Sequence, residues 1–191
     1  KDGTHTPHQL VMTATPIPRT LAMTAYADLD CSVIDELPAG RQPVRTLVMP
    51  ESKRPLLVQR VLAHCQRTEQ AYWVCPLIEE SEAIESQAAE NLEQELRAAL
   101  PELRIALLHG RMKTAAKDQT MRAFKDGELD LLVATTVIEA GVDVPNATLM
   151  LIENSERMGL AQLHQLRGRV GRGAVASSCV LLYKPPLTAH A

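Results

Sequence analysis

Residues 104–135 read RIALLHGRMKTAAKDQTMRAFKDGELDLLVAT, an order that predicts a strand, a helix and a second strand. The runs 104–108 and 129–135 are apolar and of strand length, whereas 114–125 has helical spacing. The predicted helix ends at Asp126-Gly127, because glycine takes a positive φ at little cost. Strands that are apolar on both faces are typical of a parallel sheet covered by helices on each side.

The same alternation extends outward from this unit to both sides. Further strands are predicted at 44–49, 71–78, 147–152 and 178–183. Helices are predicted at 55–65 and, from apolar residues repeating every four positions (Ile84, Ala88, Leu92, Leu96 and Leu100), up to the helix-breaking Pro101. We therefore expect an α/β fold of three layers, a parallel sheet flanked by helices.

Length and composition limit the class of protein. A chain of 191 residues with 46% hydrophobic content can close one substantial core, and its first residue, Lys1, suggests a piece of a longer protein. No apolar run approaches the roughly 18 residues that span a bilayer. The four cysteines include no C-x-x-C pair, which argues against a zinc site and a disulfide framework, and we expect no metal site.

Charge is unevenly distributed, although the net charge is only −3. Residues 79–95 hold seven Glu and no Lys or Arg, which we interpret as a solvated helix face. Basic residues gather in two groups: Arg111, Lys113, Lys117, Arg122 and Lys125, and then Arg157, Arg167, Arg169 and Arg172. Because aromatic residues make up only 3% of the chain, contact with nucleic acid should run through phosphates and be salt-sensitive.

The clearest candidate for chemistry is QLRGRVGR at residues 165–172, with three arginines in six positions. Glycine permits close backbone approach, and guanidinium groups match the geometry of phosphate oxygens. The simpler alternative is an exposed basic turn. Its glycines have the wrong order for a dinucleotide-binding fingerprint.

Two of the predicted strands end in small polar residues. Thr135 and Thr136 would offer hydroxyl and backbone N–H groups to nucleic-acid phosphates, and Asp143 could accept from a ribose or hold an arginine. The stretch Thr13-Ala14-Thr15 ends a strand predicted at 9–13, before a turn with two prolines. Each of these taken singly could be an ordinary strand end.

Together the three stretches resemble the motifs of superfamily 2 helicases: 13–15 as motif III, 135–145 as motif V and 165–172 as motif VI. Within that superfamily the chain resembles the RecG family of branch-migrating DNA helicases over nearly its whole length. This narrower resemblance is carried by residues 12–20, 35–38, 109–112 and 159–173. Transcription-repair coupling factors share the block 159–172 but lack the linker stretch at 35–40, and they are the second choice.

The resemblance implies a RecA-like, P-loop NTPase-like lobe that itself lacks a P-loop, because no G-x-x-x-x-G-K-[ST] or D-E-x-[HD] motif is present. It further implies four segments: 1–27 as the trailing strand and helix of the first lobe, 28–43 as the interlobe linker, 44–187 as the second lobe and 188–191 as a tail. The chain by itself would then neither hydrolyse ATP nor unwind DNA.

Roles for single residues follow from the same resemblance. Arg172, with Arg169 beside it, would be the arginine finger that stabilises charge on the γ-phosphate. Gly141, Asp143 and Gln165 would contact the nucleotide or position the arginines. Thr135, Thr136, Arg111 and His109 would lie towards the DNA backbone, although a histidine after a strand is often only a hydrogen-bonded structural residue. Thr13, Ala14 and Thr15 would couple the two sites.

The implied cofactors are ATP and Mg²⁺ in the full-length parent, held mainly by the first lobe, with none bound tightly here. The implied partners are branched double-stranded DNA, and the first lobe and a wedge domain in the same polypeptide. No membrane is implied, and the expected location is the bacterial cytosol, with the nucleoid. Residues 10–29 could drive an artefactual dimer. The rival interpretations are a nucleotide-binding or transferase α/β domain without a nucleic-acid role, and a partner-binding module.

Overall fold

The computed structural model describes residues 32, 34, 36, 42–76, 82–135, 144–173 and 175–187. Backbone contacts divide the chain into two units, Lys1–Glu36 and Leu37–Ala191, and nearly all the described residues belong to the second. The strand predicted at 9–13 and the motif at 13–15 lie outside the described residues. The architecture below is therefore that of the second unit.

All six strands of the described part join one parallel sheet, in the spatial order β1-β6-β5-β2-β4-β3. The strands are β1 (Arg45–Pro50), β2 (Gln70–Cys75), β3 (Ile105–Leu108), β4 (Leu131–Thr135), β5 (Ala147–Ile152) and β6 (Ser178–Tyr183). Each matches a predicted strand to within about two residues, except that the end predicted for β2 falls partly outside the described residues. The expected parallel sheet is confirmed.

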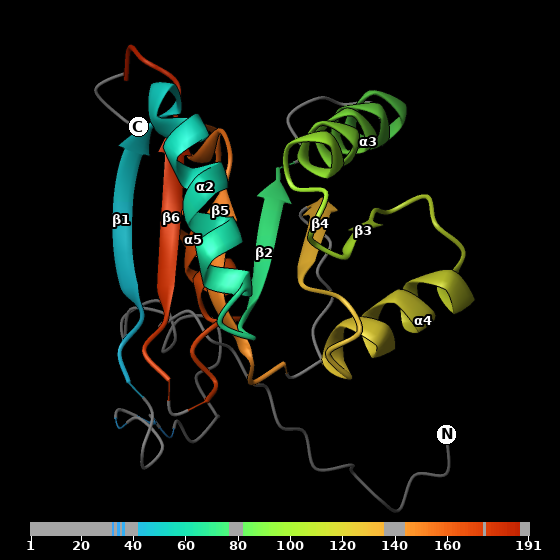
Figure 1. The fold of residues 1–191 in the computed structure, drawn as a ribbon. Helices are drawn as coiled ribbons and strands as arrows, with labels where there is room; N and C mark the ends of the chain where they lie inside the picture. Colours follow the sequence, from blue (N-terminus) through green and yellow to red (C-terminus); the bar gives the residue numbers. More distant parts are fainter. Residues whose placement is uncertain are drawn as a thin grey trace, which may run out of the picture. The chain divides into compact units, whose positions relative to one another are not determined.

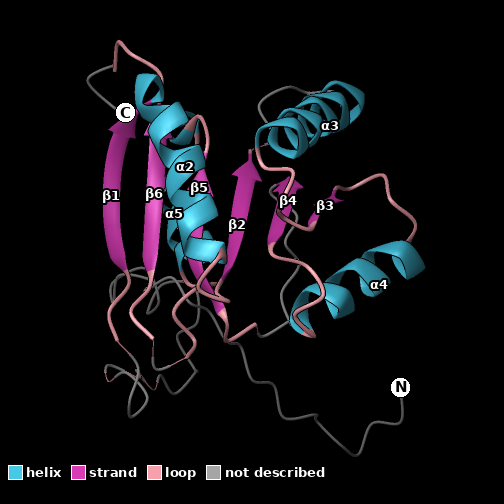
Figure 2. Cartoon of the chain, viewed as in Figure 1, coloured by secondary structure: helices cyan, strands magenta, loops and turns pink. Residues whose placement is uncertain are grey.

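Helices cover both faces of this sheet, as Figures 1 and 2 show. The helices are α2 (Arg54–Cys65), α3 (Glu82–Ala99), α4 (Thr114–Lys125) and α5 (Leu160–Arg167), with short 3-10 turns η1 (Glu51–Lys53) and η2 (Ser155–Arg157). Helices α2 and α3 pack on one face, and α4 and α5 on the other. No helix among the described residues is long and apolar enough to cross a membrane.

The core lies on both faces of the central strands, because these strands are apolar throughout. All five residues of β4 are buried, and Trp73 of β2 is fully buried beneath α2 and α3. On the opposite face Tyr72 packs against Phe124 of α4, with 4.9 Å between ring centroids. Each such large side chain contributes roughly 1.5–3 kcal/mol through burial.

Local signals explain where the helices begin and end. Pro55 lies at the start of α2, where its missing N–H costs nothing. Gly127 follows α4 with a φ of 77°, which confirms the predicted glycine-based end of that helix.

The repeat of four predicted for α3 is wrong at Ala88, and the side chain of Ile84 lies outside the described residues. Ala89 is fully buried, whereas Ala88 is exposed. An α-helix turns once every 3.6 residues, so a strict spacing of four drifts off the buried face within three turns. The inward-facing series is therefore Ala89, Leu92, Leu96 and Leu100.

Because all six strands are parallel, their carboxyl ends lie together on one side of the sheet (the carboxyl edge), and their amino ends lie on the opposite side (the amino edge). The carboxyl edge is where the strands end, and it includes Thr135 of β4 and the residues after β3. The amino edge is where the strands begin, and it includes Val44 before β1 and Pro145 before β5. These two edges hold the two groups of candidate site residues.

Candidate nucleotide and nucleic-acid sites

The arginine loop, residues 169–173, follows α5 and lies at the amino edge. Its Gly171 has a φ of 74°, and a Cβ there would lie 2.7 Å from Cγ2 of Val44. A Cβ at Gly173 would lie 3.0 Å from the carbonyl oxygen of Pro145. Both glycines therefore let the loop backbone approach the residues that precede β1 and β5, which a larger side chain would prevent.

Buried apolar residues in and next to the arginine loop hold it in place. Val170 is fully buried, and Leu166 in the last turn of α5 is 5% exposed. Arg169 and Arg172 are partly buried, and Nε of Arg172 donates to the carbonyl oxygen of Gly168 at 3.3 Å. The loop thus holds two guanidinium groups at the amino edge on a backbone fixed at several points.

The remaining predicted nucleotide residues are only partly described. Gln165 is exposed in the last turn of α5. Gly141 and Asp143 lie outside the described residues, as do Thr13, Ala14 and Thr15. Val144 is the first described residue after 136–143, and it is buried and directly precedes Pro145. The end of the predicted motif V therefore approaches Gly173, the residue directly after the predicted motif VI, through Pro145.

The carboxyl edge holds the described residues predicted to face nucleic acid. Leu108 at the end of β3 pairs with Ala134 of β4, so His109 and Thr135 follow at neighbouring strand ends. Nδ1 of His109 lies 3.4 Å from the hydroxyl of the buried Ser86 in α3. Arg111 is exposed two residues further on.

Thr135 differs from what a simple phosphate contact requires. Its side chain is 2% exposed, and its hydroxyl has no hydrogen-bond partner among the described residues. A buried hydroxyl without a hydrogen-bond partner costs roughly 1–3 kcal/mol. Thr136 lies outside the described residues.

The two groups of residues therefore lie at opposite ends of the strands. Strand β4 has five residues, which at about 3.3 Å each corresponds to roughly 15 Å. Thr135 and Val144, which flank the undescribed part of the predicted motif V, are at opposite edges. Among the described residues, those predicted to contact nucleotide and those predicted to contact nucleic acid do not share one pocket.

A third group, which sequence reasoning missed, is centred on Arg54 at the start of α2. Its guanidinium donates to both carboxylate oxygens of Glu95 in α3, at 2.8 and 3.0 Å, and to Glu153 after β5, at 2.8 Å. The same Glu153 accepts from the indole N–H of Trp73 at 3.0 Å, and Arg54 lies 5.6 Å from the Trp73 ring centroid. The hydrogen bonds to Glu95, and then the charge of Glu153, raise the pKa of Arg54 despite its partial burial. The one tryptophan of the sequence, on a predicted strand, was the only available signal.

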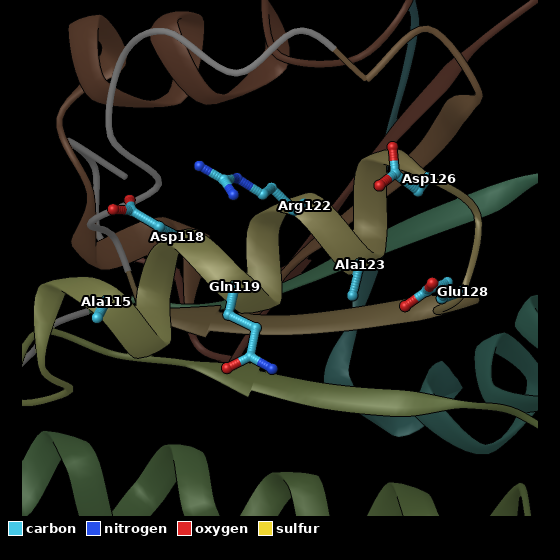
Figure 3. A pocket seen from close by; sticks show the side chains of 7 residues that line it. All are labelled: Ala115, Asp118, Gln119, Arg122, Ala123, Asp126 and Glu128. Atoms are coloured by element: carbon cyan, nitrogen blue, oxygen red, sulfur yellow. The ribbon is translucent and has the colours of Figure 1, made fainter.

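A hollow of about 420 Å³ is lined by residues of α4 and of the turn that follows it (Figure 3). Seven residues line it: Ala115, Asp118, Gln119, Arg122, Ala123, Asp126 and Glu128. Arg122 and Gln119 extend from α4 in different directions in this view. The lining carries both signs of charge and includes none of the predicted site residues.

Comparison with known proteins connects these features to a family. Residues 52–174 match the family model described as the helicase conserved C-terminal domain. The chain is 69% identical over 189 residues to ATP-dependent DNA helicase RecG of Escherichia coli (strain K12), which covers 98% of this chain and 27% of that protein. RecG of Streptococcus pneumoniae serotype 4 is 51% identical over 180 residues. The chain thus spans about a quarter of the length of these relatives.

Solved structures agree with the sequence comparison. A RecG bound to a three-way DNA junction superposes with a TM-score of 0.76 at 44% identity, covering 91% of this chain and 22% of that one. Domain 2 of the DEAD-box helicase Mss116p, bound to an RNA duplex, has a TM-score of 0.61 at 20% identity, covering 75% and 55%. The second likeness supports the fold, which is the RecA-like fold expected from the sequence.

Proposed function

Because the chain belongs to the helicase conserved C-terminal domain family, we propose that it is the second motor lobe of an ATP-dependent DNA helicase acting on branched DNA in recombination and repair. The observation that carries this proposal is the arginine loop, which holds Arg169 and Arg172 at one edge on a glycine-shaped backbone. The RecG bound to a three-way junction supports branched DNA as the substrate.

In this proposal ATP and Mg²⁺ bind mainly to a first lobe, which supplies the phosphate-binding and acidic motifs that this sequence lacks. Residues 1–27 belong to the end of that lobe, 28–43 link the two lobes, 44–187 form the second lobe and 188–191 a tail. Arg172 reaches the γ-phosphate with Arg169 beside it, and Gln165, Gly141 and Asp143 contact the nucleotide or hold the arginines.

The opposite edge carries the DNA. Arg111, His109, Thr135 and Thr136 face the phosphate backbone, and Thr13, Ala14 and Thr15 couple the two sites. Because Thr135 is buried here, its hydroxyl becomes available only after a rearrangement of the carboxyl edge. The separation of the two edges supports a motor in which lobe closure on ATP shifts the hold on DNA. The contacts are electrostatic, and salt should weaken them steeply.

The decisive experiment is steady-state ATPase activity of the full-length protein with and without forked DNA, comparing wild type with Arg172→Ala. We expect kcat to fall by roughly 10³-fold or more, since an arginine finger stabilises only the transition state. ATP binding, measured with a fluorescent analogue, should be retained. Arg60→Ala, an exposed arginine on α2, is the matched control and should behave like wild type.

An unchanged kcat in Arg172→Ala would show that the arginine loop is structural and that the proposed site is wrong. Arg172→Lys keeps the charge but loses the planar fork, so it should recover little of the activity.

Two smaller proposals concern the environment of the chain. The protein acts in the bacterial cytosol near the nucleoid, which the bacterial RecG relatives support. Residues 10–29 cause any dimerisation of the isolated chain, and gel filtration that gives a clean monomer would contradict this.

A further inference from the structure

Val44 lies where the segment predicted as the interlobe linker, 28–43, meets the first strand of the described lobe. It immediately precedes β1, whose Arg45 N–H donates to the carbonyl oxygen of Ser177 at 2.9 Å. Val44 is partly buried and packs against the apolar cluster that includes Leu166 and Val170. Val44 therefore lies directly before β1 and also packs against the apolar cluster that holds the arginine loop.

The packing of Val44 against the loop leaves no room for a side chain at Gly171. Cγ2 of Val44 lies 2.7 Å from the point where a Cβ of Gly171 would be, so the methyl group fills the space that a side chain would need. Gly171 has a φ of 74° and lies directly before Arg172. The other side of the loop is bounded by Pro145, whose carbonyl oxygen would be 3.0 Å from a Cβ at Gly173. The backbone that carries Arg172 is held between these two contacts.

We propose that Val44 is a positioning residue for ATP hydrolysis: its Cγ2 methyl sets the backbone of Gly171 and thereby the direction of Arg172. This inference rests on the proposed function. Closely packed groups do not move independently, so a shift of the segment before β1 moves the arginine backbone with it.

The test is Val44→Ala in the full-length protein, measured as DNA-stimulated ATPase activity over a range of ATP concentrations. We expect kcat to fall by roughly tenfold or more, because a misplacement of about 1 Å can cost about 10²-fold. The KM for ATP and the affinity for forked DNA should stay within about twofold of wild type, since the finger contributes to the transition state rather than to binding.

Two variants separate positioning from general loss of packing. Val44→Thr keeps the branched shape, with its hydroxyl oxygen filling the space of Cγ2 in the same rotamer, and should retain most of the wild-type kcat, although that hydroxyl lowers stability. Val48→Ala removes the same groups from an exposed position on β1, where valine is 62% exposed, and should change nothing. A kcat for Val44→Ala equal to that of wild type, or an equal loss in Val44→Thr, would overturn the proposal.

Arg172→Ala is measured in parallel, so that failure of the Val44 proposal can be distinguished from failure of the arginine-finger proposal. Loss of activity in Arg172→Ala with full activity in Val44→Ala rejects only the role of Val44. Full activity in Arg172→Ala rejects the arginine finger, and the role of Val44 with it.

Discussion

Gly171 and Gly127 have the same left-handed backbone conformation but differ in the space around them. Their φ values are nearly equal, 74° and 77°. At Gly127, which ends α4, a Cβ would meet nothing within 4 Å, whereas at Gly171 it would overlap Val44. Gly127 is required only by the turn, and Gly171 is required by the turn and by close packing.

This difference gives a prediction for unfolding. Gly127→Ala should lower the free energy of unfolding by about 1–2 kcal/mol, the cost of a left-handed alanine. Gly171→Ala should lower it by about 1–3 kcal/mol more, because the added methyl overpacks against Val44. Urea unfolding of the 191-residue chain, followed by circular dichroism, measures both. Equal losses in the two variants would mean that the loop moves freely away from Val44.

At the scale of elements, the Arg54 group ties α2, α3 and the end of β5 together. Arg54 forms a bidentate pair with Glu95, although Glu95 is 60% exposed. Hydrogen bonding from Arg54 lowers the pKa of Glu95, in opposition to its slight burial. The fully buried Trp73 lies under the guanidinium and reports on this junction by its fluorescence.

The lowered pKa predicts how this contact depends on pH. A carboxyl group with a lowered pKa in the folded state contributes stability above its ordinary pKa, 4.5 for Glu95, and loses it as the pH falls further. Glu95→Gln should therefore reduce stability at about pH 7, by roughly 0.5–1 kcal/mol for an exposed pair. The difference from wild type should shrink as the pH falls below 4.5 and Glu95 becomes protonated in the folded state.

Urea midpoints followed by Trp73 fluorescence at several pH values measure this effect. Glu90→Gln is the matched control, because Glu90 lies on the same helix and has no ion pair with any residue that the structure describes. A difference between Glu95→Gln and wild type that stays constant down to about pH 3 would contradict the expected titration.

At the scale of the whole molecule, the second unit places its two described groups of predicted site residues at opposite edges of one sheet. The arginine loop is at the amino edge, and His109, Arg111 and Thr135 are at the carboxyl edge. A lobe with this layout can respond to nucleotide at one edge and to DNA at the other, provided that a partner lobe supplies the phosphate-binding loop.

We therefore predict that the 191-residue chain neither hydrolyses ATP nor unwinds forked DNA by itself. A phosphate-release assay with increasing amounts of the chain should stay at background, and the same preparation should bind forked DNA only weakly and at low salt. Turnover that rises with the amount of chain and disappears in Arg172→Ala would show that this lobe is catalytically sufficient.

The sequence by itself determined the layered fold, the six strands and the family. These depend on local periodicity, on glycine and proline signals, and on short motifs, all of which are readable along the chain. The phosphate-binding role of the QLRGRVGR stretch stays a prediction, which rests on the geometry of guanidinium groups next to glycine.

Only the tertiary structure decided what surrounds those residues. That Val44 and Pro145 bound the arginine loop, that Thr135 is buried and that Arg54 joins two helices could not be predicted. Each involves residues far apart in the sequence, which come together through the order β1-β6-β5-β2-β4-β3. The buried face of α3 was misjudged by one residue for a related reason, since packing against the sheet follows the true helical turn rather than a spacing of four.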